Sequence, residues 1–356
     1  IQTLIDQQKG GFKLEPWDWN FYAEQVRKAK YDLDENEIKP YFELNNVIEK
    51  GVFYAAEKFY GLTFKKRTDL PVYHPDVMVY EVFDRDGKSF ALYYLDFYTH
   101  NNKRGGAWMS NFVEQSHYLK QQPVITNVFN YQKPAAGKPT LLSFDEMITT
   151  FHEFGHTLHG LFANQQYKSL SGTSVPRDFV EFPSQINEHF ALVPEVLANY
   201  ALHYETGEQM PQALVEKIKK AANFNQGYFT TELVSAAMVD MTCHTVTSKD
   251  QIIPVLEFEK NALTKTGLNL KEVPPRYHTP YFAHVWGGGY SAGYYAYIWS
   301  ETLDSDAWEW IEANGGMTRE NGDRFREYIL SIGNTKDLNQ AFEDFTGRKA
   351  SIEPLL

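Results

Sequence analysis

The sequence has very little cysteine and no long apolar run. Its single Cys among 356 residues cannot form an intrachain disulfide, so nothing in the chain requires an oxidising compartment. An apolar run of about 18 residues, the length that spans a bilayer as a helix, is absent. Ile1 to Gly10 lack the apolar stretch of a secretory signal. We therefore expect a cytoplasmic protein, and a periplasmic one only if a signal peptide belongs to a longer precursor.

The sequence also lacks an excess of positive charge. Lys and Arg number 34 against 46 Asp and Glu, which gives a net charge of −12. An acidic surface repels phosphate backbones and anionic lipid headgroups, so we expect neither nucleic acid nor a membrane as a partner. Hydrophobic residues make up 43% and charged residues 22% of the chain, which is typical of folded globular proteins and excludes a disordered or fibrous chain.

Three segments of the chain have the composition of β-strands. Val77–Phe83 and Ser89–Tyr98 are rich in β-branched and aromatic residues. They flank Asp86-Gly87, a pair that favours a hairpin turn. Val124–Phe129 has a similar composition, so we expect a small sheet.

Helical patterns dominate the rest of the chain. Ser143 and Glu146 have the spacing of a capping box, in which each side chain satisfies a backbone N–H group at a helix start. Helices are expected over residues 16–30, 43–60, 143–162, 178–192, 194–203, 211–224, 228–246, 254–263, 290–313, 319–331 and 337–345. The predicted fold is mainly α with a small β-sheet, in one region over 1–356: a helical lead-in at 1–66, the sheet at 77–130 and a second helical part at 143–356.

The strongest chemical signal is HEFGH at residues 152–156, an HExxH pattern. Residues four apart lie on one face of a helix, so the imidazoles of His152 and His156 can reach one metal ion. Glu153 would stand beside that ion and act as a general base without being a ligand. The pattern predicts one Zn²⁺ ion in a hydrolytic site.

A catalytic zinc site needs a third protein ligand. His159 follows on the same stripe but lies about 10.5 Å along the helix axis from His152, so one ion cannot bind both. We expect His159 to be a polar residue near the cleft, or a residue behind the ligands if it belongs to the site at all. The longer pattern HExxHxxGxxH is excluded, because positions 159 and 162 hold His and Phe. Downstream, Glu181, Glu188 and Asp178 are all candidates. One of them would be the ligand, while another would orient a ligand imidazole.

Three segments resemble a known family in their order and content. FHEFGHTLHGLF, GTSVPRDFVEFPSQ and FAHVWGGGYSAGYYAYIW resemble the thimet oligopeptidase-like zinc metallopeptidases, and most of all their bacterial peptidyl-dipeptidase branch. The resemblance covers essentially the whole chain. It implies a zincin-like fold, short peptide substrates and release of C-terminal dipeptides, and it implies that Glu181 is the third ligand. An endo-acting oligopeptidase of the same family and an inactive zinc-binding fragment are the alternatives.

A glycine-rich segment precedes a group of tyrosines. Gly287–Gly289 predict a flexible loop in front of a helix with Tyr290 and Tyr297, seven residues apart, on one face. By spacing alone such tyrosines pack in a core more often than they react. We keep that interpretation for Tyr294 and Tyr295.

The resemblance gives a different role to other residues of this segment. It implies that His284, Tyr290 and Tyr297 contact the substrate or stabilise the oxyanion. Gly288 and Gly289, in the loop between them, are assigned to substrate binding.

Release of a dipeptide also needs a cation for the substrate's terminal carboxylate. Arg276 and Arg177 are the candidates for that cation. The family also pairs an edge strand with the peptide backbone, for which we expect Val124–Asn130. Its members are much longer, and the part absent here, their N-terminal half, forms the other wall of a channel around the zinc.

Overall fold

The computed structural model describes residues 1–356. Their contacts divide them into two compact units, one made of Ile1–Glu37 with Pro211–Ile298 and the other of Ile38–Met210 with Trp299–Leu356. The short helix α3 (Glu35–Ile38) and the long helix α13 (Ala296–Ala313) run across two of the three points at which the chain passes from one unit to the other. As predicted, the fold is mainly helical with one small sheet. None of its helices combines the length and apolar character needed to cross a bilayer.

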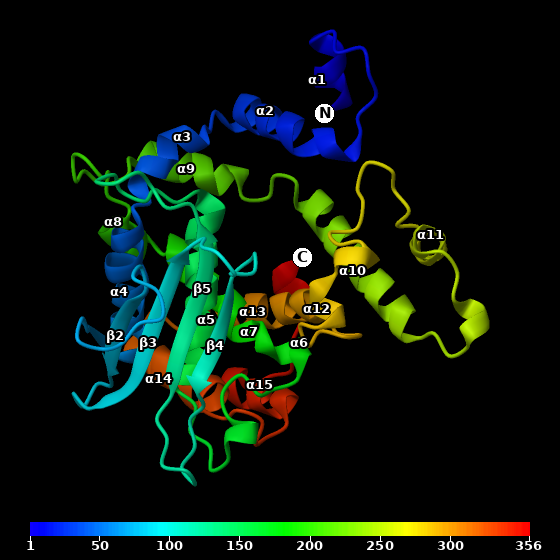
Figure 1. Cartoon of the computed structure of the whole chain (residues 1–356). Coiled ribbons are helices and arrows are strands. Elements are labelled where there is room, and N and C mark those ends of the chain that lie inside the picture. The colour runs from blue at the N-terminus through cyan, green and yellow to red at the C-terminus, as the bar shows by residue number, and fades with distance from the viewer. The chain divides into compact units, whose positions relative to one another are not determined.

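The second unit contains the five-stranded sheet, shown in blue to blue-green in Figure 1. Its spatial order is β1-β2-β3-β5-β4. β3 and β5 pair in parallel, and the other neighbours are antiparallel. The strands are β1 (Thr63–Lys66), β2 (Met78–Phe83), β3 (Ser89–Tyr98), β4 (Trp108–Val113) and β5 (Val124–Tyr131).

The sheet corrects one prediction about the strands. β2, β3 and β5 lie where the sequence places them, but the Val124–Asn130 segment is not an edge strand, because β5 lies between β3 and β4. Its residues are buried almost without interruption, as in an interior strand, whereas exposed residues recur along β4. The edge at this end of the sheet is therefore β4, whose mixed polar sequence gives a weak strand signal.

Helices cover the sheet and continue the second unit. The capping box is confirmed, because Ser143 Oγ accepts from the backbone N–H of Glu146 at 3.1 Å and the Glu146 carboxylate accepts from that of Ser143 at 2.8 Å. The helices are a π-helical turn (Asn46–Val52), α4 (Phe53–Tyr60), α5 (Phe144–Leu161), α6 (Arg177–Val180), α7 (Phe182–His189), α8 (Pro194–Tyr200), α14 (Arg319–Phe325), a second π-helical turn (Arg326–Leu330) and α15 (Leu338–Thr346).

α5 runs along one face of the sheet, against β4 and β5 (Figure 1). Gly160 permits this close approach, since a Cβ there would lie 2.6 Å from Met109 Cε and 2.7 Å from Ile125 Cδ1. Asn127 of β5 also ties the sheet to the helix. Its amide donates to the carbonyl of Glu153 at 3.0 Å, and its oxygen accepts from Thr157 Oγ1 at 2.9 Å.

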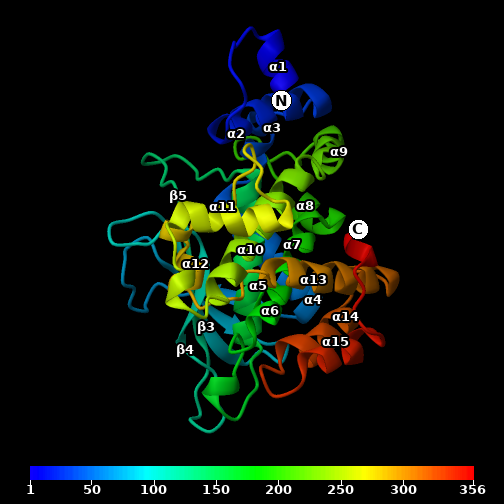
Figure 2. The ribbon, with the colours of Figure 1, turned by 90° about the vertical axis from the view of Figure 1, so that its right-hand side faces the viewer.

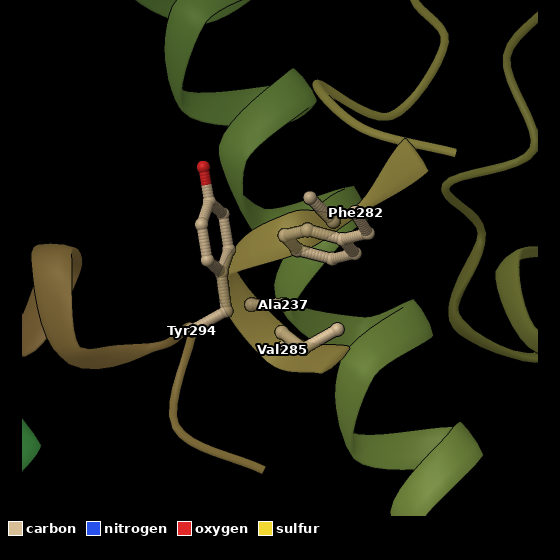
Figure 3. Packing of buried hydrophobic residues seen from close by; sticks show 5 residues of the cluster. Ala237, Phe282, Val285 and Tyr294 are labelled. Atoms are coloured by element: carbon tan, nitrogen blue, oxygen red, sulfur yellow. The ribbon is translucent and has the colours of Figure 1, made fainter. Parts of the chain in front are cut away.

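The first unit is entirely helical. Figure 2 shows α11 lying beside α10. Its core gathers Ala236 and Ala237 of α10 with Phe282, Val285 and Tyr294, and Figure 3 shows the rings of Tyr294 and Phe282 meeting above Ala237. The helices are α1 (Gln2–Gln7), α2 (Trp19–Tyr31), α9 (Gln212–Ala221), α10 (Gln226–His244), α11 (Val255–Thr266) and α12 (Ala283–Trp286).

The helix predicted to begin at Tyr290 begins only at Ala296. Gly289 and Ala292 have positive φ angles of 84° and 53°, and such left-handed residues cannot continue a right-handed helix. Tyr294 is buried in the core as predicted. Tyr295, also expected to pack, is instead 38% exposed.

α5 and α7 pack closely at Gly155, so a substitution at this residue tests the packing of the two helices. A Cβ there would lie 2.3 Å from Pro183 O and 2.6 Å from Ser184 Cα. We expect Gly155→Ala to push the helices apart, to lower the free energy of unfolding by ~1–3 kcal/mol and to weaken metal binding. Thermal unfolding and metal content measure both effects. Gly227→Ala, with open space around the added Cβ, is the control and should keep the stability and the metal content of the unaltered protein. If Gly155→Ala changed neither quantity, the close contact at Gly155 would not be required for the packing of α5 and α7.

Candidate metal centre

The structure brings together one group of three metal-binding side chains in the second unit. His152 and His156 lie on α5, and Glu181 lies between α6 and α7. One ligand atom of each lies within 4.8 Å of the others. Glu181 Oε2 is 3.3 Å from His152 Nε2 and 3.1 Å from His156 Nε2. Two imidazoles and one carboxylate are a donor set found in catalytic zinc sites, so the residues present fit such an ion.

Local structure holds Glu181 in place. The helix predicted over 178–192 is broken at this residue, and α7 begins after it with Pro183 in its first turn, a position that suits proline because its missing N–H has no helical partner. Ser184 Oγ lies 2.7 Å from Glu181 O and 3.1 Å from its Oε2, so it can donate to either. Asn187 Nδ2 donates to the carbonyl of Phe151 at 2.6 Å and joins α7 to α5.

The buried charges at the centre stabilise one another. Burial raises the pKa of Glu181, but the neighbouring His156 and His152 outweigh that effect and hold this pKa well below its usual range. Burial lowers the pKa of His152, whereas its hydrogen bonds to Glu181 and Glu188 raise that pKa well above the usual value. Glu181 is therefore ionised at neutral pH, as a metal ligand must be.

The three acidic candidates have separate places. Only Glu181 joins the imidazole pair. Glu188 Oε1 accepts from His152 Nδ1 at 2.7 Å, an arrangement that leaves Nε2 of that ring directed to Glu181 and is common behind metal-ligating histidines. Asp178 stands outside the group, and its carbonyl accepts from Ser300 Oγ at 3.2 Å.

Glu153 is buried beside the ligands, with 5% of its surface exposed. Its Oε2 atom is buried without a hydrogen-bond partner. Burial raises the pKa of Glu153; the charges of His152 and His156 oppose this shift, and those of Glu181 and Glu188 add to it. A carboxylate with a raised proton affinity and a free oxygen is suited to take up a proton.

The expectation for His159 is wrong. The side chain is completely buried rather than near a cleft, and neither ring nitrogen has a hydrogen-bond partner. Its ring packs against Phe179, with centroids 6.4 Å apart. Burial, with a smaller effect from His156, lowers the pKa of His159 to about 3. It is a neutral core residue, and nothing in its spacing from the ligands revealed this.

His284, Tyr290 and Tyr297 form a separate cluster in the first unit. The rings of Tyr290 and Tyr297 stack at 5.6 Å and 4°. The ring of His284 lies 5.9 Å from that of Tyr290 and 6.4 Å from that of Tyr297. The structure therefore gathers the three residues, although Tyr290 precedes the helix on which it was predicted. Gly288 fits against His284, where a Cβ would lie 2.9 Å from the backbone carbonyl oxygen, and Gly289 has a positive φ.

The two candidate cations differ in their surroundings. In the first unit, Arg276 Nη1 lies 2.8 Å from Glu232 Oε1 on α10, so this guanidinium is already in an ion pair. Arg177 begins α6 in the second unit and is exposed.

Sequence reasoning missed the polar side chains that support the metal helix. Asn127 and Asn187 reach carbonyls on opposite sides of α5, and neither belongs to a recognisable motif. One signal was available for Asn127, since it is a polar residue in the middle of the apolar strand β5. A buried amide in that position needs a specific partner.

The ligand set, the helix that carries it and the small sheet beside it are those of a metallopeptidase. Comparison with known families matches residues 1–356 to Peptidase family M3, and the chain belongs to that family. Membership implies a metal at the His152, His156 and Glu181 group.

Among curated proteins, the chain is 56% identical to dipeptidyl carboxypeptidase of Escherichia coli (strain K12) and 54% identical to that of Salmonella typhimurium, in each case over 100% of this chain and 52% of the relative. It is 37% identical to oligopeptidase A of Escherichia coli, over 100% of this chain and 53% of the relative. The chain thus spans about half the length of the curated relatives it matches.

Distant solved structures share the fold. The structure of BsuCP aligns with a TM-score of 0.52 at 13% identity and covers 94% of this chain and 61% of that one. The M32 carboxypeptidase from Deinococcus radiodurans R1 aligns with a TM-score of 0.51 at 11% identity, over 90% of this chain and 59% of that one. At these identities the likeness concerns the fold alone.

The hydrogen bond from His152 to Glu188 generates a test of the centre. Glu188→Gln keeps the shape of the side chain but removes the charge that orients the imidazole, so we expect metal affinity to fall ~10–100-fold. Titration against a competing chelator measures this affinity. Glu195→Gln, an exposed change at the start of α8, should leave it unchanged. Equal affinities for the two variants would show that Glu188 has no orienting role.

Proposed function

We propose that the protein carrying this chain is a zinc-dependent peptidase that releases dipeptides from the C-terminus of short peptides. The observation that carries the proposal is the convergence of His152, His156 and Glu181, with the buried Glu153 beside them. The identity of 56% to a dipeptidyl carboxypeptidase supports the specific activity.

One Zn²⁺ ion would be held by His152, His156 and Glu181. When bound there, such an ion would lower the pKa of a water molecule toward ~7 and polarise the scissile carbonyl. Glu188 fixes the orientation of the His152 ring through its 2.7 Å hydrogen bond. Ser184 Oγ, 3.1 Å from Glu181 Oε2, can donate a hydrogen bond to that carboxylate.

Glu153 is the proposed general base. Its raised pKa and its Oε2 atom without a partner suit it to accept the proton of the attacking water. The same carboxyl group then passes that proton to the leaving amine as the peptide bond breaks.

His284, Tyr290 and Tyr297 are proposed to contact the substrate. The Tyr297 hydroxyl would donate a hydrogen bond to the oxyanion, and loss of such a donor typically raises the barrier by ~3–4 kcal/mol. The loop at Gly288 and Gly289 is proposed to close over a bound peptide together with this cluster.

Two further features would select the substrate. The free edge of β4, rather than β5, is proposed to pair with the peptide backbone, a contact that tolerates varied side chains. Arg177 or Arg276 would bind the terminal carboxylate. Because Arg276 is paired with Glu232, binding there would have to compete with that carboxylate.

An endo-acting oligopeptidase is the second candidate. The identity of 37% to oligopeptidase A favours it, and the metal chemistry would be the same. For either activity, we also propose that the protein acts on peptides in the cytoplasm. We further propose that a segment corresponding to the remaining half of the longer relatives contributes to the site.

Replacing the proposed base should separate catalysis from metal binding. Glu153→Gln removes the proton acceptor but no ligand, so we expect zinc to be retained and turnover to fall by roughly 10²-fold or more. Glu181→Ala, in contrast, should lose zinc. Metal analysis and cleavage of a fluorogenic peptide compare the variants. Normal turnover of Glu153→Gln would exclude this residue as the base.

The exo-acting mode can be tested with one peptide in two forms. A dipeptide-releasing enzyme recognises the free carboxylate through a cation, so we expect cleavage of the free-ended peptide and almost none of its C-terminal amide. Mass spectrometry of the products reports the cut site, and a chelator should stop all cleavage. Equal cleavage of both forms would favour the oligopeptidase alternative.

A further inference from the structure

A buried carboxylate on α10 holds the turn that precedes Tyr297. Asp240 is completely buried. Its Oδ1 atom accepts from the backbone N–H of Ala292 and its Oδ2 atom from that of Tyr294, both at 2.9 Å. His244 Nδ1 lies 2.9 Å from Oδ1 on the same helix. One side chain thus binds two alternate backbone groups of a segment more than fifty positions away.

The turn needs such a partner because its backbone is not helical. Ala292 has a φ of 53°, a conformation that residues other than glycine adopt only when their surroundings hold them there. The N–H groups of Ala292 and Tyr294 belong to a turn and not to a helix. Buried N–H groups without a partner are rare, so these two need acceptors from elsewhere. Asp240 supplies both acceptors from a single rigid helix.

The 292–294 turn lies in the chain between the two stacked tyrosines, Tyr290 and Tyr297. The ring of Tyr294 packs in the core at α10 and lies 5.2 Å from that of Tyr297. Tyr297 in turn stacks on Tyr290, whose N–H donates to His284 O at 3.0 Å. A shift of the backbone at 292–294 would therefore move both stacked phenols.

We propose that Asp240 is a positioning residue that holds the phenols of Tyr290 and Tyr297 in their working geometry by binding the 292–294 turn. The inference rests on the proposed function, in which those tyrosines contact the substrate. Asp240 touches no reacting atom; it acts through the backbone that carries them.

Asp240→Asn tests this role with little change of volume. An amide has one acceptor oxygen and presents an NH₂ group to the second N–H, so at most one backbone bond survives. We expect hydrogen–deuterium exchange at Ala292 and Tyr294 to become at least roughly tenfold faster, because one backbone hydrogen bond is lost. We expect kcat to fall roughly tenfold, because the tyrosines are then held less firmly in position. Zinc content and KM should change much less.

The matched control is Glu259→Gln in the same unit. Glu259 is another buried carboxylate, on α11, and accepts from a backbone N–H, that of Thr279 at 2.6 Å, and from His278 Nδ1 at 2.7 Å. This control loses the same kind of interaction in a segment that carries neither Tyr290 nor Tyr297. We expect it to destabilise the protein but to keep kcat and the exchange rates at 292 and 294.

The measurements distinguish the possible failures. Rapid exchange at Ala292 and Tyr294 in the unaltered protein would by itself show that Asp240 does not hold the 292–294 turn. Faster exchange in Asp240→Asn with unchanged kcat would overturn the positioning role. If the unaltered protein shows no chelator-sensitive peptide cleavage, the proposed function fails, while the exchange data still decide whether Asp240 holds the turn.

Discussion

The closeness of α5 and α7 at Gly155 is the constraint on which the metal centre depends. The carbonyl of Pro183 occupies the space that a side chain at this position would need. That contact sets the distance between the imidazole pair and the start of α7, where Glu181 lies. The ligand geometry is therefore fixed by the packing of two helices and not by a mobile loop.

Buried polar groups extend this constraint outward. Asn127 binds α5 from the sheet and Asn187 binds it from α7, while Glu188 holds the far side of the His152 ring. Each satisfies a partner that would be costly to bury alone. Because these contacts surround the same two turns of helix, the ligands and Glu153 sit on a support that resists small displacements.

Much of this arrangement could be predicted where the signal is local. The HExxH spacing, the Ser143 cap and three strands depend on neighbouring residues. The choice of Glu181 by geometry, the burial of His159 and the edge position of β4 depend on tertiary packing, which spacing does not encode. The late start of α13 has a similar cause, since the backbone at Ala292 is set by a carboxylate more than fifty positions earlier.

The exposed edge of β4 has a consequence for self-association. A strand paired on one side presents unsatisfied N–H and C=O groups that can template the edge of another molecule. β4 has only six residues, and its register shifts between Asn111 and Val113. A short, interrupted edge can align only a few residues of another chain and offers little length for the growth of a continuous sheet between molecules.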